Sequence, residues 1–465
     1  MLAAMSTAPH PSSSQATAVS RDAGDACPGA LRLHEADDGA LARVRIPGGV
    51  LTVEQAVVLG DAARLLGDGE LHLTSRGNVQ LRGLRAACGA ELAELLGAAG
   101  LLPSPAHERV RNVVASPLSG LDGRGARDVR RWLTDLDAAL CASAAAVALS
   151  GRFLFALDDG RGDVAGLGAD VTVRATHGEG ALLSLGSAPE ALRVSGEDAP
   201  RAAVLAAEVF LDVARARGAR VWRIHELDVP DDELTGAVAR GLTRAGIGCA
   251  RVARDTAEDR DTTENRDTTE NRDTTEGRDT TELRDTVEAA GPAPGRAGAA
   301  LCAHAPFGRL TAAQWREVMR AAAAFPTREL RLTPWRGLVV PAPDAGPGRA
   351  ADVLARLAAI GLVTDATSPW PRVGACTGRP GCAKSRADVR ADAGRALTAA
   401  GRAPLPVYWS GCERRCGHPR GDRVDVVAEP GGGYRLTTAV RGQDPRGTSL
   451  DDPSGFAAAL AAILP

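Results

Sequence analysis

The sequence contains few aromatic residues and lacks any long apolar run. Phe, Trp and Tyr together make up 3% of the 465 residues, and no stretch approaches the roughly 18–20 consecutive apolar residues that a membrane-spanning helix needs. A formal net charge of -3 also lacks the basic excess that nucleic-acid binding usually requires. We therefore expect a globular cytoplasmic protein with substantial cores and without a nucleic-acid or membrane partner.

Closely spaced cysteines are also absent from most of the chain. Five of the nine cysteines are scattered: Cys27, Cys88, Cys141, Cys249 and Cys302. This pattern is typical of a reducing compartment, where cysteines are mostly small buried apolar residues. Residues 1–29 lack a compact apolar segment beside basic residues, so they predict a disordered tail and not a signal peptide.

The other four cysteines stand close together near the C-terminus. Cys376 and Cys382 form a C-x5-C pair, and Cys412 and Cys416 form a C-x3-C pair. Four thiolates from two loops are the ligand set of a 4Fe-4S cluster, and a predicted helix over 385–399 would direct free N–H groups at it. Structural zinc, for which the five-residue spacing is wide, and disulfides are the alternatives.

The chain repeats itself with a fixed offset. Residues 51–81 align without a gap to residues 310–340, because 310 - 51 = 259. Each copy predicts a helix that starts with a capping box, at Thr52 in the first copy and at Thr311 in the second. The aligned identities are Leu51, Thr52, Gln55, Ala62, Ala63, Glu70, Leu71, Leu73 and Thr74. We infer an internal duplication.

Each copy then predicts a β-hairpin. Residues 71–82 alternate apolar and polar on both sides of a turn in which Gly77 and Asn78 are expected to take positive φ. The second copy repeats the hairpin over 330–340. A helix near 87–97 and a strand over 109–115 would complete a small split βαβ unit in the first copy.

Composition divides the chain into six segments. Residues 254–288 are six near-identical hexapeptides, close to Arg-Asp-Thr-Thr-Glu-Asn, which hold too few apolar residues to bury a core. We interpret them as a solvated linker. The predicted segments are a tail (1–29), a first repeat unit (30–110), an α/β domain (111–253), the disordered linker (254–298), a second repeat unit (299–368) and an α/β domain with the four cysteines (369–465).

The two copies differ where chemistry would occur. The stretch that matches the approach to Cys376 has no cysteine, and the first copy is instead rich in arginine: Arg76, Arg82, Arg109 and Arg111. Arginine forms bidentate pairs with carboxylates. We predict that these residues bind a polyanionic ligand beside the redox centre.

These motifs carry a family resemblance. Thr74-Ser-Arg-Gly-Asn-Val-Gln80, Arg111-Asn-Val and the two cysteine pairs resemble the nitrite/sulfite reductase family, over about residues 40–250 and 300–460. The resemblance implies an α+β fold, internally duplicated, with two ferredoxin-like half-domains and two α/β domains in pseudo-two-fold arrangement. It implies sirohaem beside the cluster, the four cysteines as cluster ligands, and Arg76 and Arg111 in contact with the macrocycle or substrate.

One departure from the reductases changes the expected reaction. Where they carry two lysines that protonate the oxyanion, this chain has Arg152 and Leu154, and leucine supplies no proton. The strand Phe-x-Phe-Ala-Leu-Asp-Asp-Gly and Ser-Gly-Cys412 onward are similar to another branch, the precorrin-3B synthases of aerobic cobalamin biosynthesis. That branch implies a monooxygenase that hydroxylates precorrin-3A at C20 with γ-lactone formation, so Arg152 joins the predicted substrate-binding residues.

The resemblance also implies partners and further metals. Dioxygen, an anionic tetrapyrrole substrate and an external NADH-dependent electron donor are expected, together with a mononuclear non-haem iron whose candidate imidazoles are His72, His107 and His418. Catalytic residues are not identified. A sulfite or nitrite reductase with sirohaem, or a non-catalytic electron-carrier or tetrapyrrole-handling protein, is the alternative function.

Overall fold

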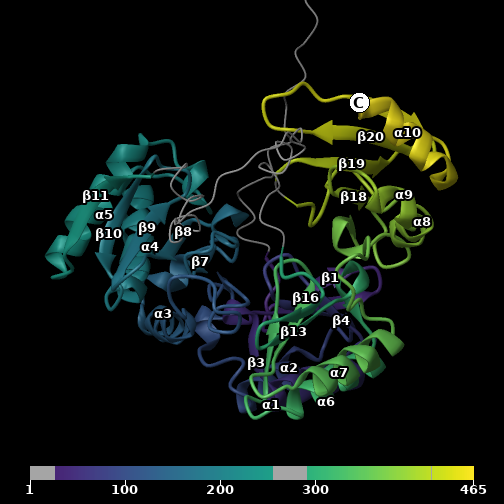
Figure 1. Cartoon of the computed structure of the whole chain (residues 1–465). Coiled ribbons are helices and arrows are strands. Elements are labelled where there is room, and N and C mark those ends of the chain that lie inside the picture. The colour runs from purple at the N-terminus through teal and green to yellow at the C-terminus, as the bar shows by residue number, and fades with distance from the viewer. Residues whose placement is uncertain (1–26, 255–290, 420, 465) are drawn as a thin grey trace, which may run out of the picture.

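The computed structural model describes residues 27–254, 291–419 and 421–464. Most of the predicted tail and the hexapeptide repeats after Arg254 lie outside the described residues. Figure 1 shows three bodies: a central body, drawn in purple and green, and two α/β domains, drawn in blue to teal and in lime to yellow.

The central body consists of two five-stranded sheets, one from each copy of the repeat. Their strand orders are β1-β2-β5-β4-β14 and β12-β13-β16-β15-β3. The first half contributes β1 (His34–Ala36), β2 (Gly39–Val44), β3 (Val50–Thr52), β4 (Leu71–Leu73), β5 (Val79–Leu84), α1 (Val53–Leu66) and α2 (Gly89–Ala98). The second half contributes β12 (Gly295–Ala297), β13 (Ala300–His304), β14 (Arg309–Leu310), β15 (Glu329–Leu332), β16 (Gly337–Pro341), α6 (Ala312–Ala323) and α7 (Pro347–Ala359).

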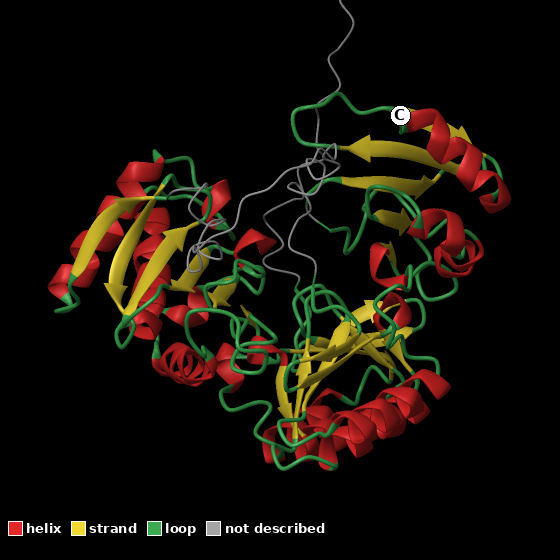
Figure 2. Ribbon diagram, in the orientation of Figure 1, coloured by secondary structure: helices red, strands yellow, loops and turns green. Residues whose placement is uncertain are grey.

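Each half gives one edge strand to the sheet of the other half. β3 pairs with β15 of the second half, and β14 pairs with β4 of the first half, both antiparallel. Figure 2 shows the helices of the central body on its outer side, away from the two α/β domains. The two halves therefore share one hydrophobic core and do not fold as separate units.

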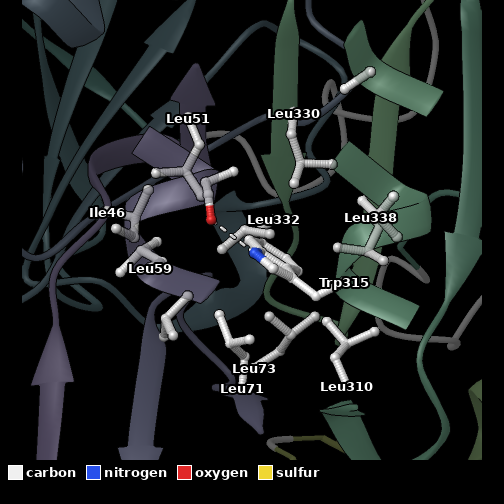
Figure 3. Close-up of a cluster of buried hydrophobic side chains, with 14 of the residues drawn as sticks. Ile46, Leu51, Leu59, Leu71, Leu73, Leu310, Trp315, Leu330, Leu332 and Leu338 are labelled. Atoms are coloured by element: carbon white, nitrogen blue, oxygen red, sulfur yellow. Dashed lines mark hydrogen bonds between the residues drawn. The ribbon is translucent and has the colours of Figure 1, made fainter. Parts of the chain in front are cut away.

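The shared core confirms the predicted duplication. Both capping boxes are formed, and α1 and α6 pack against each other. The Nε1 of Trp315 donates a hydrogen bond of 2.7 Å to the carbonyl of Ala56, the residue 259 positions earlier (Figure 3). A Cβ at Gly60 would lie 2.7 Å from the Trp315 ring, so the indole occupies space that only glycine leaves open.

The turn of the first hairpin differs from the prediction at one residue. Gly77 has φ 66° as expected, but Asn78 is not among the described residues with positive φ. Its Oδ1 instead accepts from the Ile46 N–H at 2.9 Å, and its Nδ2 donates to Asn112 Oδ1 at 3.1 Å. In the second hairpin the positive φ of 61° falls on Arg336, the counterpart of Gly77.

The first α/β domain contains a six-stranded sheet of order β11-β10-β9-β8-β7-β6. Its elements are β6 (Val113–Ala115), α3 (Arg130–Ala142), β7 (Phe155–Asp158), β8 (Val171–Ala175), β9 (Gly180–Leu185), β10 (Glu190–Ser195), α4 (Ala199–Ala216), α5 (Asp231–Arg244) and β11 (Cys249–Ala253). The expectation that residues 109–115 complete the first repeat unit was wrong: β6 pairs in parallel with β7 in this sheet.

The second α/β domain repeats that topology on a smaller scale. Its elements are β17 (Val373–Ala375), α8 (Val389–Arg395), α9 (Leu397–Gly401), β18 (Val407–Ser410), β19 (Arg423–Ala428), β20 (Tyr434–Ala439), β21 (Gly447–Leu450) and α10 (Phe456–Ile463). In both domains three neighbouring strands are parallel and the next pairings are antiparallel.

Two predicted boundaries need correction. The single helix predicted over 385–399 is two short helices, and the first begins only at Val389, where the side chain of Asp388 caps the Ala391 N–H. The predicted linker ends earlier than residue 298, because β12 already pairs with β13. The α+β class, the duplication and the pseudo-two-fold arrangement are as the sequence predicts.

Among the described helices, none has the length and apolar character that crossing a bilayer requires.

Candidate functional site

The four paired cysteines lie on loops that follow two neighbouring parallel strands. β17 leads directly into Cys376, and β18 leads through Gly411 into Cys412. Carboxyl ends of adjacent parallel strands meet at one edge of a sheet, where ligands commonly bind in α/β proteins. The Cys376 N–H donates to the Trp409 carbonyl at 2.9 Å, and the Gly411 N–H donates to Cys376 Sγ at 3.2 Å.

Glycine is required where these loops touch. A Cβ at Gly411 would lie 1.9 Å from Ser385 Oγ, so any side chain there would push the two cysteine loops apart. The Arg386 N–H donates to the Gly411 carbonyl at 2.9 Å and ties the loops together. The hydroxyl of Tyr408 donates to the Cys416 carbonyl at 2.7 Å and fixes the end of the second loop.

The four sulfur atoms are brought together, with a spacing wider than zinc would need. Cys416 interacts electrostatically with the other three thiols, and burial raises the pKa of Cys376 and of Cys416. No three of these Sγ atoms lie within 4.8 Å of one another, whereas Zn–S bonds of about 2.3 Å in a tetrahedron hold sulfurs about 3.8 Å apart. A cubane cluster spans the wider spacing.

The disulfide alternative is contradicted, because all nine cysteines are free thiols. The donor chemistry of four converging thiolates therefore fits an iron–sulfur cluster. Two arginines supply positive charge beside the loops: Arg390 donates from Nε to the Cys376 carbonyl at 3.1 Å, and Arg336 donates from Nη2 to the Gly417 carbonyl at 3.2 Å. Burial, with Arg309 and Arg336 nearby, lowers the pKa of Arg390 to about 10.

A group of arginines lies on the first half-domain and the adjoining α/β domain. We call Arg43, Arg45, Arg76 and Arg223 the arginine group. Arg43 lies on β2 and Arg45 follows its last residue, Val44. They alternate with Ala42 and Val44, which belong to the helix-side core, so both arginines use the opposite face. Arg223 reaches this place from the first α/β domain, where its Nε donates to Asp170 at 2.5 Å.

Like charges and burial make this group electrostatically unfavourable without an anion. Burial, with Arg43 and Arg76 among the neighbours, lowers the pKa of Arg45 to about 9. Burial, with Arg223 and Arg43 nearby, lowers the pKa of Arg76 to about 10. Among the described residues, Arg43 Nε and Arg45 Nη1 are buried nitrogen atoms without a hydrogen-bond partner. Unpaired buried donors are costly, so the group is suited to an anionic ligand.

Arg76 is the member of this group that the sequence predicted. Arg109 contributes its carbonyl, which accepts from Arg45 Nε at 3.2 Å. Arg82 turns away from the group and forms a bidentate pair with Asp38 at 2.7 Å.

The two other predicted arginines have structural partners of their own. Arg111 forms a buried bidentate pair with Asp137 at 2.7 Å and donates to the Leu101 carbonyl at 3.1 Å. Arg152 is exposed, and its guanidinium lies 4.3 Å from the ring centroid of Trp222. A substrate contact for either residue stays a prediction, and both would have to leave or share these partners.

Sequence reasoning missed Arg43, Arg45 and Arg223. The first two carry a readable signal, since Arg-Val-Arg on a strand places both side chains on one face. Arg223 has no local signal, because only the tertiary fold brings it near Arg76.

Leu154, which stands in place of a reductase lysine, is buried in an apolar cluster. It is 3% exposed and packs with Val114, Ala156, Val164 and Ala169, and the ring of Trp335 closes this cluster from the second half-domain. The position therefore offers neither a proton donor nor space for a charge.

The described histidines do not assemble the mononuclear iron site that the resemblance implies. Both ring nitrogens of His107 have partners, at Ser104 Oγ and the Ser143 carbonyl, and His418 bonds the Arg415 carbonyl. His72 lies 3.9 Å from the carboxylates of Asp68 and Glu70.

Even that group is a poor iron site, because Glu70 is held in a bidentate pair by Arg309. Sequence reasoning overlooked His304, which is buried with an unpartnered Nε2 and whose pKa burial lowers to about 4. It has no described carboxylate partner in a metal-sized group.

The first α/β domain carries an acidic group where the second carries cysteines. Strand register places Val113 opposite Phe155 and Val373 opposite Val407, so Ser116 is the counterpart of Cys376. Asp158, Asp159 and Asp163 gather beside Ser116, with carboxylate oxygens within 4.8 Å of one another. Backbone N–H groups and Arg161 satisfy two of the carboxylates.

Comparisons with known proteins agree with this architecture. The nitrite/sulfite reductase ferredoxin-like half domain family matches residues 34–99 and 293–360. A precorrin-3B synthase of Sinorhizobium sp is 26% identical over 94% of this chain and 87% of its own length. A ferredoxin–nitrite reductase of Synechococcus elongatus is 35% identical over 26% of this chain and 25% of its own.

A solved structure supports the fold independently. The Mycobacterium tuberculosis NirA protein superposes with a TM-score of 0.65 at 19% identity, covering 90% of this chain and 79% of that one. The chain thus resembles precorrin-3B synthase over nearly its whole length and contains the two half-domains of the nitrite/sulfite reductase family. The named relatives are enzymes and support an oxidoreductase.

Proposed function

We propose that this protein is an oxygen-dependent monooxygenase of aerobic cobalamin biosynthesis that hydroxylates precorrin-3A at C20, with γ-lactone formation, to give precorrin-3B. The observation that carries the proposal is the arginine group, with its unpaired buried donors Arg43 Nε and Arg45 Nη1, in a chain whose cysteine loops gather four thiols. The similarity to a precorrin-3B synthase over 94% of the chain supports the same reaction.

The arginine group would bind the carboxylate side chains of the tetrapyrrole substrate. Its guanidinium groups are desolvated and crowd one another, so a carboxylate gains charge-assisted hydrogen bonds and relieves their repulsion. Arg45 is held in place by the carbonyls of Arg109 and Gly151, at 3.2 Å each, and presents its free Nη1 without needing to reorganise. Such preorganisation lowers the entropic cost of binding.

The cysteine loops would hold the redox centre. Cys376, Cys382, Cys412 and Cys416 would hold a 4Fe-4S cluster, which when bound supplies single-electron transfer. The overall reaction balances when dioxygen gives one oxygen atom to the C20 hydroxyl and the other to water. It takes up two electrons and two protons, and we propose that NADH supplies the electrons through an external donor protein. We also place the protein in the cytoplasm.

Leu154 favours hydroxylation over sulfite or nitrite reduction. Reduction of those oxyanions consumes several protons at the metal, and the apolar cluster of Leu154 and Trp335 excludes both water and ionisable groups from that position. The reductases remain the second candidate because two half-domains of their family are present.

Isotope incorporation tests the proposed reaction. Anaerobically purified protein, supplied with precorrin-3A, NADH, a reductase and labelled dioxygen, should form a product that carries one labelled oxygen at C20. Turnover without dioxygen, or absence of label from the product under every donor tested, would overturn the monooxygenase. A visible spectrum with the intense bands of bound sirohaem, and sulfite or nitrite consumption, would support the reductase instead.

Binding measurements test the arginine group separately. Arg45→Met should weaken binding of the tetrapyrrole about 10- to 100-fold, since each charge-assisted hydrogen bond is worth about 1.5–3 kcal/mol. Arg64→Met, which removes an exposed arginine on α1, should leave the dissociation constant unchanged. Equal affinity of both variants and the wild type would show that the arginine group does not bind the tetrapyrrole.

A further inference from the structure

The loop that carries Cys382 is held by residues from the other half of the chain. The carbonyl of Gly381 accepts a hydrogen bond of 2.7 Å from Arg82 Nη2. The N–H of Ala383 donates a hydrogen bond of 2.5 Å to Asp37 Oδ2. The two peptide groups on either side of Cys382 are therefore both anchored to the first half-domain, 299 and 346 residues away in sequence.

A third residue fixes the guanidinium that makes this contact. Asp38 accepts from Arg82 Nε and from Arg82 Nη2, each at 2.7 Å. Arg82 is 5% exposed and the Asp38 side chain 27% exposed, so solvent screens the pair only weakly. A bidentate pair of this kind orients the guanidinium as well as binding it. We call Asp37, Asp38 and Arg82 the latch.

The pseudo-two-fold counterpart of the latch has no charge. The turn between β1 and β2 holds Asp37 and Asp38, and the matching turn between β12 and β13 holds Gly298 and Ala299. The offset of 259 places Pro341 at the position of Arg82. There the second half-domain meets the first α/β domain through an apolar cluster of Leu118, Ala300, Cys302 and Val339, with Leu121 and Ala297 packed against it. Arg331 also joins these two domains, since its Nη1 donates to the carbonyls of Pro117 and Ser119 at 2.8 and 2.9 Å, but it is not the counterpart of any latch residue.

We infer that the latch residues Asp37, Asp38 and Arg82 position Cys382 as a cluster ligand and limit opening of its loop. The inference rests on the proposed function, because it presupposes the 4Fe-4S cluster. It gives Arg82 a positioning role at the loop, with Nε and Nη2 both committed, instead of the substrate contact that the sequence predicted. A sheet of the substrate-binding half thereby sets the geometry of the redox centre in the other half.

Cluster retention, measured in the full-length protein, tests the latch. Wild type, Arg82→Met and Asp37→Asn would be purified anaerobically, assayed for iron and acid-labile sulfide per chain, and then exposed to an iron chelator while the cluster absorbance is followed. Loss of a residue that supports a metal ligand typically weakens metal binding about 10- to 100-fold. We expect Arg82→Met to lose its cluster faster by that factor, and Asp37→Asn to lose it faster by a smaller one.

The matched control is Arg85→Met, which removes an exposed arginine three residues away that pairs with Glu91 at 3.3 Å. It should lose its cluster at the wild-type rate. Asp37 is exposed and makes a single contact to the loop, so Asp37→Asn decides the question should Arg82→Met not fold. Melting curves of the cluster-free chains show whether a variant has lost stability in general. Cluster release is then compared at a temperature at which all variants are folded.

The outcomes distinguish the latch from the proposed function. If the wild type holds iron and sulfide and both latch variants release them at the rate of Arg85→Met, the latch inference is wrong while the cluster stands. If the wild type holds no acid-labile sulfide, the proposed redox centre is wrong, and the latch inference, which presupposes it, is wrong as well. Faster release from either latch variant, with wild-type melting of the cluster-free chain, supports the inference.

Discussion

The two α/β domains show how one scaffold carries two kinds of chemistry. In the second domain the Gly411 N–H donates to Cys376 Sγ at 3.2 Å, and in the first domain the Asp159 N–H donates to Ser116 Oγ at 3.1 Å. The strand ends and the hydrogen bond are conserved between the domains, and the receiving atom changes from sulfur to oxygen. Backbone topology thus fixes where a side chain can act, and the residue type fixes what it does there.

Each α/β domain makes contacts with the central body that include an arginine bound to backbone carbonyls. The first α/β domain meets the second half-domain through apolar clusters that include Trp335 and Val339, and through Arg331, whose Nη1 donates to the carbonyls of Pro117 and Ser119 at 2.8 and 2.9 Å. The second meets the first half-domain through Arg82 and Asp37. Apolar burial stabilises without directional contacts, whereas hydrogen bonds to two peptide groups specify a loop geometry. Directional contacts are thus made to both α/β domains, and those made to the second domain flank Cys382, a predicted cluster ligand.

The largest effect is expected from removing a thiol from the cysteine loops of the second α/β domain. Cys412→Ser removes one of four thiolates, so bound iron should fall more than about tenfold and turnover with it, since an alcohol is a poor ligand for iron–sulfur clusters. Iron and sulfide analysis and the magnetic resonance signal of the reduced protein measure this. Cys249→Ser, a half-buried cysteine outside both loops, is the control, and an unchanged spectrum in Cys412→Ser would dismiss the four-cysteine assignment.

The apolar contact of the first domain can be broken in turn. Leu154→Lys places a charge without a partner beside Trp335 and should lower the free energy of unfolding by about 3–5 kcal/mol. Urea unfolding measures this change. Val147→Lys, at a position 42% exposed, should stay within about 0.5 kcal/mol of the wild type.

Two results would contradict this account of Leu154. Unfolding of Leu154→Lys at wild-type urea concentrations would show that the cluster is open to water. Appearance of sulfite or nitrite reduction in that variant would show that the lysine reaches the redox centre, and would favour the reductase function.

The acidic group of Asp158, Asp159 and Asp163 should make the free energy of unfolding depend on pH through the first α/β domain. Burial and the nearby Asp158 raise the pKa of Asp163 to about 7 in the folded chain, compared with about 3.9 when unfolded. The folded state therefore holds a proton that the unfolded state has released, and the free energy of unfolding should fall as pH rises from about 4 to about 7.

Unfolding measurements across that range test the sign. Asp163→Asn should remove this part of the slope because the amide does not titrate. Asp212→Asn, in an exposed ion pair on α4, should leave the slope unchanged. A slope that persists in Asp163→Asn would mean that another group binds the proton.

The smallest effect is expected from shortening the segment that joins the two halves of the chain. Deleting residues 260–281, within the hexapeptide repeats, should leave melting and turnover nearly unchanged, because these residues are almost all polar. Shortening a connection between two folded parts changes the free energy of its closure by less than about 1 kcal/mol. Thermal unfolding and a turnover assay check this, and a large loss of either would show that the repeats bind or pack.

The sequence was informative where the signal was local. The capping boxes at Thr52 and Thr311, the hairpins and the duplication follow from patterns within a few turns of chain, and the structure confirms them. Three expectations failed because tertiary contacts decided them. The side chain of Asn78 is used for bonds to distant residues, residues 113–115 pair with β7, and the helix near Val389 starts late because the cysteine loops come first.

The candidate site shows the same division. The four cysteines are readable because their spacing is itself the signal. Arginine is common in this chain, so its presence alone does not indicate which guanidinium groups converge. Of the five arginines predicted to bind substrate, Arg76 joins the arginine group, while Arg82 and Arg111 pair with Asp38 and Asp137.

Local pattern alone determined the repeated helices and hairpins and the two cysteine loops, because hydrogen-bonding periodicity and ligand spacing act over a few residues. The exchange of lysine for leucine at position 154 follows from the family resemblance. The tertiary structure decided which charges face one another. Arg82 reaches Gly381 across 299 residues of sequence, and Arg223 comes to lie near Arg76. Electrostatic interactions depend on distance in space and on burial, and the linear order of residues specifies neither.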